Sequence, residues 1–553
     1  MSASSAPVVI VGAGPVGMVL ALELSHQGIT SMLVEARPTT TNFPKMDETN
    51  ARSMELLSRL GIADEIRSVG VGAEYSFDTV FCSSLVGREL ARWPEPSAAQ
   101  MQRHIDSSID GSTPAEPWQR VSQELAEAVL MRRCLEDPMI DVRRPFRVVD
   151  VADDGVFVTT TLGHADTGES QTVLSSYVVG CDGARSQVRE CAGITQEGTE
   201  ELLSLALVHF RSRDLKHLQA HGQFWHLYFA TGGILIAQDE RDTWTLHALV
   251  PNDSTTESLD SQALVHQVTG APVEIDEILA QSVWRPNILL ADKYRVGRVF
   301  LAGDACHQVI PNGGYGMNTG IGDAVDLGWK LAAVLSGWGG EALLDSYESE
   351  RRPVAAQNLE WSARHVGAQL EILDEFDLEL IDQDSPEADK HREYMADFIS
   401  VRRGEASSPG IEYGYCYSDS PVLDVEAEDP YVLDPTTYVP TTRPGARAPH
   451  VTLADGGSLL ALFSRGFTLV DHGGEGGSSL IAAARDLGVP VQHILLDPSG
   501  SSAKVYEHSL VLVRPDGHVA WRSDRVEGDP RAIITRVVGG PPVLTHAPLA
   551  VQR

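Results

Sequence analysis

The pattern of apolar and polar residues predicts two kinds of structure along the chain. Near the N-terminus the unbroken apolar run Val8–Val11 is typical of a parallel strand buried on both faces. A glycine-rich turn follows, then a helix expected over Met18–Leu24 and a second strand over Ser31–Val34. Further apolar strands end in Gly-Cys-Asp-Gly at 180–183 and in Gly-Asp at 303–304. We therefore expect an α/β domain whose strands come from distant parts of the chain.

A different pattern fills the region between these strands. It is aromatic, β-branched and broken by turn residues, which indicates a mostly antiparallel sheet inserted into the α/β domain. The expected strands are Leu205–Phe210, Phe224–Phe229, Gly233–Ala237 and Trp244–Val250, with strand-like pieces near Thr79–Phe81. Such a sheet could form the roof of a pocket for a flat apolar ligand.

Helical patterns mark the rest of the first 400 residues. We expect helices over Asn50–Gly61, Arg120–Leu130 and Gly320–Leu335, and a long helical region from Leu343 to Arg402 that breaks near Pro386. These patterns give three units. The α/β domain takes residues 1–75, 117–190 and 291–400, the inserted sheet takes 76–116 and 191–290, and a linker or wrapping segment spans 401–445.

The last unit, residues 446–553, reads as a small α/β domain. Its expected strands are Ser458–Phe463, Phe467–Val470, Val491–Leu496 and Ser509–Val513, with a helix over Ser478–Leu487. Pro515-Asp516-Gly517 predicts a hairpin into His518–Trp521.

The first glycine-rich turn has the spacing of a dinucleotide-binding motif. Gly12 would permit the turn, Gly14 would let the backbone approach a pyrophosphate, and Gly17 would let helix and strand pack. Pro15 and Val16 lie between them, and Glu35 ends the next strand, where its carboxylate can accept hydrogen bonds from a ribose. A carboxylate there disfavours a 2′-phosphate, so the resident ligand is expected to be FAD or NAD.

Composition and charge narrow the classes of function. The chain has 553 residues, 42% hydrophobic and 22% charged, with a net charge of -34, which disfavours nucleic acid and anionic membranes as partners. No apolar run is long enough to span a membrane and no signal peptide is apparent, so we expect a cytoplasmic protein. The six cysteines lack metal-binding spacing, and no metal site is expected.

Taken together, the Gly12–Glu35 turn, Asp182-Gly183 with Arg185 and Arg189, and Gly303-Asp304 with the loop 311–318 resemble the motifs of the FAD-dependent aromatic hydroxylases. These are the single-component class A flavoprotein monooxygenases, and the resemblance covers about residues 7–400. It implies a Rossmann-like (GR2-type) FAD-binding domain with an inserted antiparallel substrate sheet. The C-terminal unit resembles the thioredoxin-like domain of a subset of the family. It has no CxxC, so a role in assembly or stability is expected.

The resemblance implies roles for particular residues. Asp304 would bond the ribityl chain, and the helix entrance at Gly316-Met317-Asn318 would aim backbone N–H groups at the flavin N1/C2 edge. Asp182 would serve FAD and a transiently docked NAD(P)H, because the chain has no second GxGxxG turn. The expected cofactor-binding residues are Gly12, Gly14, Pro15, Val16, Gly17, Glu35, Ala36, Arg37, Arg52, Arg120, Gln123, Asp182, Gly303, Asp304, Pro311, Gly314, Gly316, Met317 and Asn318.

The implied reaction is NAD(P)H- and O2-dependent hydroxylation of a phenolic or other electron-rich aromatic substrate through a flavin C4a-hydroperoxide. His209, His226, Tyr228 and His247 on the inserted sheet are candidates for substrate contacts and for the base, although each could be an ordinary sheet residue. Pro311 and its glycines would let the backbone lie close to the flavin ring. The expected partner is a small aromatic molecule, and a homodimer is considered.

Other functions stay open at this point. The same scaffold supports Baeyer–Villiger or epoxidising oxygenases, and a different class would be an NAD-dependent dehydrogenase or a non-catalytic dinucleotide-binding module. The Gly303-Asp304 loop argues against the latter two. Flavin halogenases share the fold, but the chain has no GWxWxIP-like segment. The sequence does not choose between NADH and NADPH or name the substrate.

Overall fold

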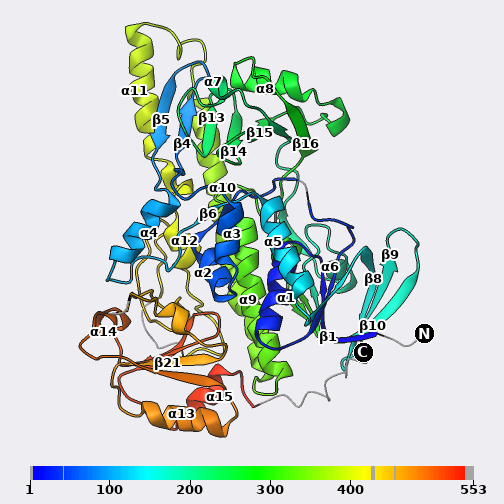
Figure 1. Ribbon diagram of the computed structural model, residues 1–553, viewed down its shortest axis with the longest axis vertical. Coiled ribbons are helices and arrows are strands. Elements are labelled where there is room, and N and C mark those ends of the chain that lie inside the picture. Colours follow the sequence, from blue (N-terminus) through cyan, green and yellow to red (C-terminus); the bar gives the residue numbers. More distant parts are fainter. Residues whose placement is uncertain (1–3, 42, 425–429, 454–455, 542–553) are drawn as a thin grey trace.

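The computed structural model describes residues 4–41, 43–424, 430–453 and 456–541. The molecule is elongated (Figure 1), with the inserted sheet at one end, the C-terminal domain at the other, and the large α/β domain between them. This order places the large domain in contact with both of its neighbours.

The large domain is built on an eight-stranded sheet with the order β18-β19-β10-β1-β2-β7, and a hairpin of β8 and β9 extends it from β10. Strands β7, β2, β1, β10 and β19 are parallel, as expected for a Rossmann-like domain. The strand bounds are β1 Ser4–Val11, β2 Ser31–Val34, β7 Ile140–Arg143, β8 Phe146–Asp153, β9 Val158–His164, β10 Ser170–Gly180, β18 Arg295–Val296 and β19 Val299–Leu301.

Apolar burial fixes the position of the central strand. Val8, Val9 and Ile10 are completely buried, because helices and strands cover β1 on every side. Helix α1 (Pro15–His26) packs against α9 (Tyr315–Leu335) and α5 (Gln123–Glu136), and α2 (Ala51–Arg59) packs against α9. The carboxyl ends of β1 and β19 therefore lead into α1 and the loop before α9 on the same edge of the sheet.

The expected helix over Arg120–Leu130 needs a correction at its start. Helix α5 begins at Gln123 behind Ser122, whose backbone is extended, and Arg120 lies instead in the short strand β6 (Gln119–Arg120). Strand β6 pairs with β3 (Glu48–Thr49). The helical periodicity after Arg120 concealed this two-residue pairing.

The inserted sheet has seven strands in the order β16-β12-β15-β14-β13-β4-β5. All neighbouring pairs are antiparallel except β4 and β13. One face packs against α8 (Ser261–Thr269), with Val208, Leu246 and Val265 completely buried between them. The strand bounds are β4 Thr79–Cys82, β5 Glu89–Trp93, β12 Leu205–Arg211, β13 His226–Phe229, β14 Gly233–Ala237, β15 Thr243–Leu249 and β16 Glu277–Trp284.

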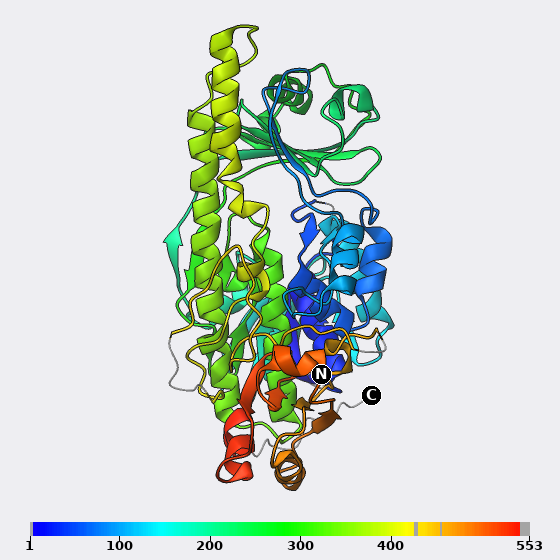
Figure 2. The same cartoon turned by 90° about the vertical axis from the view of Figure 1, so that its left-hand side faces the viewer.

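Two smaller features connect the domains. A three-stranded sheet joins β11 (Gln196–Thr199), β17 (Ile288–Ala291) and β20 (His307–Gln308) where the chain enters and leaves the inserted region. Helix α10 (Glu341–Asp374) runs along the large domain and reaches the inserted sheet, and α11 (Pro386–Ser400) returns beside it (Figure 2). The expected break in this helical region thus lies between 375 and 385.

The C-terminal domain has a four-stranded sheet in the order β22-β21-β23-β24, with β21 and β22 parallel and the others antiparallel, as in a thioredoxin-like domain. The expected strand over Ser458–Phe463 is wrong: a short 3-10 turn, η4 (Leu460–Leu462), stands there, and among the described residues Ser458 pairs only with Thr452, in an isolated bridge. The bounds are β21 Phe467–Asp471, α13 Gly477–Asp486, β22 Val491–Leu495, α14 Ser501–Tyr506, β23 Leu510–Val513, β24 Val519–Ser523 and α15 Pro530–Val537.

Buried charges join this domain to the large domain. Arg514, which is fully buried, donates to Glu350 Oε1 and Asp326 Oδ1, each at 2.7 Å. Lys330 Nζ bonds the same two carboxylates at 2.6 and 2.7 Å. Inside the protein, each of these buried charges is compensated by the opposite charges next to it. The interface therefore depends on both domains being present.

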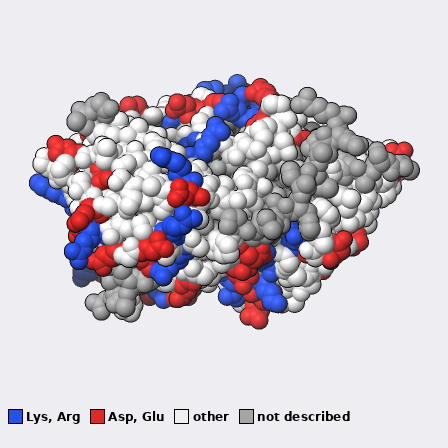
Figure 3. Space-filling view, turned by 90° about the horizontal axis from the view of Figure 1, so that it is seen from below, with Lys and Arg blue, Asp and Glu red and all other residues white. Residues whose placement is uncertain are grey.

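The surface charges form no single patch in the view from below. Lys and Arg side chains are interspersed with Asp and Glu across that face (Figure 3). No helix among the described residues combines the length and apolarity that crossing a membrane requires.

Candidate cofactor and substrate site

The first glycine-rich turn is shaped by two close backbone approaches. Gly12 has φ +99°, and a Cβ there would lie 2.3 Å from the carbonyl oxygen of Cys181. A Cβ on Gly17 would lie 1.9 Å from the Gly12 carbonyl oxygen, whereas one on Gly14 would meet no protein atom within 4 Å. Gly12 and Gly17 are therefore needed for packing, and Gly14 leaves open space at the N-terminus of α1, where a pyrophosphate fits.

Glu35 ends β2 beside this turn. Its carboxylate accepts hydrogen bonds from the backbone N–H of Ala13 at 2.9 Å and of Arg37 at 2.8 Å. Glu35 is buried, while Ala36 and Arg37 are exposed. The carboxylate is thus fixed next to the phosphate-binding turn, the position that a ribose hydroxyl requires.

The second motif contacts the third. Asp182 accepts hydrogen bonds from the backbone N–H groups of Gln187 at 2.8 Å and Val188 at 3.2 Å, so its carboxylate is occupied by the start of α6 (Gln187–Cys191). Burial raises the pKa of this carboxyl although its hydrogen bonds oppose the shift. Arg189 donates from Nη1 to the Ala305 carbonyl oxygen at 3.2 Å. The segment that follows the turn at Asp182-Gly183 is therefore hydrogen-bonded to the loop at Gly303-Asp304.

Asp304 has a free carboxylate among the described residues. Gly303, at φ +65°, is held by a hydrogen bond from its N–H to Asp323 Oδ2 at 3.1 Å, and it packs on Val16. This turn leaves the Asp304 side chain open to solvent on one side. Desolvation by the surrounding protein raises the pKa of the Asp304 carboxyl, against the charges of His307 and Lys45. A hydrogen bond from a polyol would compensate this desolvation.

The segment Pro311–Asn318, here called the flavin loop, leads into α9. Gly313 and Gly314 have φ +84° and +65°, and Pro311, which is exposed, accepts a hydrogen bond from Gly314 N–H at 2.9 Å. A Cβ on Gly316 would meet no protein atom within 4 Å, so the first turn of α9 is open to a ligand.

Asn318 and Met317 follow in the same turn of α9. The Asn318 side chain donates to the Gly314 carbonyl oxygen at 2.7 Å and accepts from Asn50 N–H at 3.1 Å. Met317 is partly buried against the core of the large domain. Asn318 therefore ties the open helix end to the start of α2.

Three further predicted ligands already have protein partners. Arg52, which is buried, donates to the Asp516 carbonyl oxygen of the C-terminal domain at 2.7 Å and pairs with Glu55 at 3.1 Å. Arg120 donates to the Ser76 carbonyl oxygen at 3.0 Å, and burial lowers its pKa to about 10. Gln123 bonds Glu127 at 2.7 Å. Their contact with a cofactor stays a prediction.

The face of the inserted sheet opposite to α8, here called the substrate face, carries the four predicted substrate contacts. Because side chains alternate between faces, residues two apart on one strand share a face. His209, His226, Tyr228 and His247 all lie on the face opposite to α8. In the strand register they form two adjacent rows, Thr79–His226–Ile236–Thr245–His209–Ala280 and Phe81–Tyr228–Ile234–His247–Leu207–Ser282.

His226 bridges this face to the large domain. Its Nε2 lies 3.1 Å from Oδ2 of Asp47, and Trp225 Nε1 donates to the same oxygen at 2.8 Å. The Trp225 and His226 rings stack at 4.1 Å. Burial would raise the pKa of Asp47, but the hydrogen bonds from His226 and Trp225 outweigh it and the pKa is lowered. Asp47 was missed because it stands in an irregular stretch with no motif.

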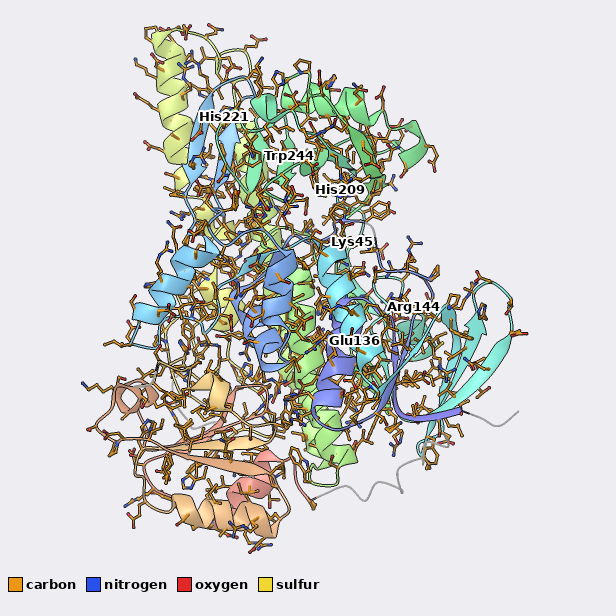
Figure 4. The ribbon with its side chains drawn as sticks, in the orientation of Figure 1. Lys45, Glu136, Arg144, His209, His221 and Trp244 are labelled. Atoms are coloured by element: carbon orange, nitrogen blue, oxygen red, sulfur yellow. The ribbon has the colours of Figure 1, made fainter. Side chains whose placement is uncertain are left out.

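The other two histidines are held neutral. His209 is 1% exposed, and its Nδ1 lies 3.0 Å from Thr245 Oγ1. Its Nε2 has no partner among the described residues, and His247 makes no hydrogen bond there. Burial lowers the pKa of both imidazoles to about 4. Figure 4 places His209 on the side of the sheet that faces the large domain, above Lys45.

Tyr228 is joined to the flavin loop by two residues that the sequence did not indicate. Gln369 on α10 donates from Nε2 to Tyr228 Oη at 2.7 Å, and its Oε1 accepts from Asn312 Nδ2 at 2.9 Å. Asn312 Nδ2 also donates to Glu405 Oε1 at 3.1 Å, and Glu405 bonds Gln369. Glu405 lies in the segment that was expected to be a linker.

The described residues contain no group of three or more His, Cys, Asp or Glu side chains arranged for a metal ion. All six cysteines are free thiols, and burial raises the pKa of Cys306 and Cys181 next to the Gly-Asp loop. Neither thiol is therefore a candidate nucleophile.

The fold and site define a dinucleotide-binding enzyme whose two open glycine positions and free Asp304 fit FAD. Comparison with known families agrees: residues 5–362 match the FAD binding domain, and residues 441–541 match the aromatic-ring hydroxylase C-terminal domain. The chain belongs to the FAD-dependent aromatic-ring hydroxylase and monooxygenase family.

Curated relatives extend over nearly the whole chain. The FAD-dependent monooxygenase apdD of Emericella nidulans is 42% identical over 95% of this chain and 88% of its own length. The 4-methyl-5-nitrocatechol 5-monooxygenase of a Burkholderia species is 34% identical over 96% of both chains. The aklavinone 12-hydroxylase RdmE of Streptomyces purpurascens is 32% identical over 94% of this chain and 96% of its own.

Solved structures are similar throughout. RebC with bound 7-carboxy-K252c has a TM-score of 0.87 and 32% identity, covering 97% of this chain and 100% of that chain. The flavin-dependent monooxygenase PieE in complex with FAD and substrate has a TM-score of 0.86 and 30% identity, covering 97% and 99%. The predicted fold class and the family resemblance are thus confirmed.

Proposed function

We propose that this enzyme uses NAD(P)H and O2 to hydroxylate a phenolic or similarly electron-rich aromatic substrate. Bound FAD would supply electron transfer from NAD(P)H and transfer of one oxygen atom from O2. The named activities of two relatives, a 4-methyl-5-nitrocatechol 5-monooxygenase and an aklavinone 12-hydroxylase, support this substrate class.

The residues present fit the cofactor as follows. The N-terminus of α1 would hold the pyrophosphate, Glu35 the adenosine ribose and Asp304 the ribityl chain. The open first turn of α9 would direct backbone N–H groups and its positive helix end at the flavin ring, and so stabilise negative charge there. In this arrangement the ring would lie at the flavin loop, between the large domain and the inserted sheet.

The substrate face would bind and activate the aromatic ring. Ile234, Ile236 and Leu207 provide apolar area that excludes water, and neutral His209 and His247 can accept hydrogen bonds from a phenol. His226 is the best candidate for the base, because Asp47 fixes its ring and stabilises the imidazolium that forms when it takes a proton. A deprotonated phenol is a better nucleophile towards oxygen.

The single observation that carries the proposal is the register of the sheet, which puts His209, His226, Tyr228 and His247 on one face, tied to the flavin loop through Tyr228. The test is oxidation of NADH and NADPH by the flavin-loaded protein across a panel of phenols, aromatic acids and polycyclic quinones. We expect a phenolic compound to stimulate oxidation and to yield a product heavier by one oxygen. Oxidation that no panel member stimulates, with only peroxide formed, would count against it.

A further inference from the structure

The flavin loop is attached to the substrate face by a closed set of side-chain hydrogen bonds. Asn312 in the loop donates both to Gln369 at 2.9 Å and to Glu405 at 3.1 Å. Gln369 in turn donates to Tyr228 at 2.7 Å and to Glu405. Glu405 also accepts the backbone N–H of Gly313. Two elements, α10 and the segment after α11, therefore contact two residues of the loop, and α10 joins them to β13 through Tyr228.

These bonds occupy the side-chain nitrogen of Asn312 and both polar atoms of the Gln369 side chain. Asn312 Nδ2 donates to two acceptors, Gln369 Oε1 and Glu405 Oε1. Gln369 accepts through Oε1 and donates through Nε2. The loop backbone has positive φ at Gly313 and Gly314, so it has little conformational preference of its own. An external support is the physical means by which such a glycine-rich segment keeps one shape.

The far end of the network is rigid as well. The Tyr228 ring stacks on Phe81 with centroids 5.0 Å apart and planes 13° apart, which fixes its hydroxyl. Burial and then the charge of Glu405 raise the pKa of Tyr228, so the hydroxyl stays protonated. It accepts from Gln369 and retains its own proton to donate towards the substrate face.

We propose that Gln369 and Glu405 are positioning residues that fix the flavin loop relative to Tyr228, and so set the distance between the flavin and the substrate. This inference rests on the proposed function for its meaning, but the attachment itself is testable with FAD alone. Neither residue needs to contact the cofactor, because both act through Asn312 and Gly313.

The test is a double-mutant cycle on FAD affinity, measured by quenching of flavin fluorescence when apoprotein is titrated with FAD. Tyr228→Phe removes the acceptor of Gln369, and Gln369→Leu removes the connection. A lost buried hydrogen bond corresponds to about a fivefold change in affinity. We expect each single variant to bind FAD about 3- to 10-fold more weakly, and the double variant to bind no more weakly than Gln369→Leu alone.

Two controls make the result specific. Tyr394→Phe loses a comparable hydrogen bond, 3.0 Å from its hydroxyl to Glu375 beyond the end of α10, and should leave FAD affinity unchanged. If Gln369→Leu does not fold, Glu405→Gln, which keeps the shape and removes the charge, takes its place in the same cycle. FAD affinity unchanged in Tyr228→Phe, or effects that multiply in the double variant, would overturn the proposal.

A second readout separates this inference from the proposed function. If Glu405→Gln loosens the loop, this variant should form more peroxide per NAD(P)H consumed. The control is Glu371→Gln, at an exposed position on α10. A parent protein that oxidises neither NADH nor NADPH would refute the proposed function, while the FAD titration would still decide the network.

Discussion

His226 Nε2 and Asp47 Oδ2 lie 3.1 Å apart although the histidine belongs to the inserted sheet and the aspartate to the large domain. The pair therefore forms only when the two domains are docked. Trp225 donates to the same carboxylate oxygen and so holds Asp47 in place. The fixed carboxylate in turn orients the imidazole of His226.

We expect Asp47→Asn to reduce substrate-stimulated NAD(P)H oxidation by about 100-fold, the lower end of what general acid–base catalysis contributes. His226→Phe should have a similar effect, and the double variant should be no worse than either. The loss should shrink as pH rises and the phenol ionises without help. Asp78→Asn, which removes a partly exposed charge pair with Arg92 and can still accept the hydrogen bond from Glu95 N–H, is the control. Equal losses at all pH values would contradict a role in proton transfer.

Gly14→Ala is expected to separate cofactor affinity from folding. The added Cβ meets no protein atom within 4 Å, so the melting temperature of the apoprotein should hold, yet the methyl group occupies space that the pyrophosphate needs. FAD affinity should fall at least about tenfold by fluorescence titration, roughly 1.4 kcal/mol. Gly367→Ala on α10, equally unobstructed, should bind FAD normally. Normal FAD binding by Gly14→Ala would place the pyrophosphate elsewhere.

Asp304→Ala removes the one carboxylate of the Gly-Asp loop that has no hydrogen-bond partner among the described residues. Because the Asp304 side chain is exposed and makes no hydrogen bond with the described residues, the fold should tolerate alanine and the stability of the apoprotein should hold. Purified variant should carry little flavin, judged by its visible absorbance. Full flavin occupancy would refute the assignment of Asp304 to the ribityl chain.

Arg514→Leu should destabilise the whole protein. It leaves Glu350 and Asp326 buried with only Lys330 as a cation, and breaking a buried pair costs about 3–5 kcal/mol. Chemical denaturation should show the lower midpoint. Arg531→Leu, whose partner Asp486 is exposed, should change stability by less than about 0.5 kcal/mol. Equal stabilities of the two variants would mean that the domains do not depend on the buried network.

Acid should destabilise the protein through its neutral histidines. The pKa of His209 is about 4 when folded against an ordinary 6.5, so this contribution to stability is complete above about pH 6.5 and is lost as pH falls towards 4. Each such histidine adds a slope of about 1.4 kcal/mol per pH unit in that window. Unfolding midpoints of His209→Leu should depend less on pH there. His104→Leu, on exposed α4 (Ala98–Ser107), should keep the full slope.

The motifs of the large domain could be read from the sequence because each glycine has a local geometric reason. A side chain on Gly12 or Gly17 would collide with backbone atoms, whereas Gly14 and Gly316 leave room for a ligand. The spacing of the glycines was therefore enough to predict the motif. The four candidate residues on the inserted sheet could be named because their strands were predicted, and the strand register puts them on one face; their contact with a substrate stays a prediction.

Long-range partners could not be predicted in the same way. Asp47, Gln369 and Glu405 lie in an irregular loop, a helix interior and an apparent linker, and only the docked domains bring them to His226, Tyr228 and Asn312. Arg52 also has a partner that the sequence did not indicate: its guanidinium donates to the Asp516 carbonyl oxygen of the C-terminal domain, while its contact with the cofactor stays a prediction. Ser458–Phe463 has strand-like composition, but its only strand-like pairing in the described part of the chain is the local bridge from Ser458 to Thr452, and a 3-10 turn follows.

The buried network around Arg514 also affects biosynthesis. Asp326 and Glu350 leave the ribosome long before Arg514, one of their two cationic partners, is translated. Until then Lys330 alone faces the two carboxylates, so burying them costs more and the large domain is less stable while synthesis continues. Expression yield should therefore depend on translation speed and chaperone supply, and chains truncated before Arg514 should be degraded rather than accumulate as a smaller active enzyme.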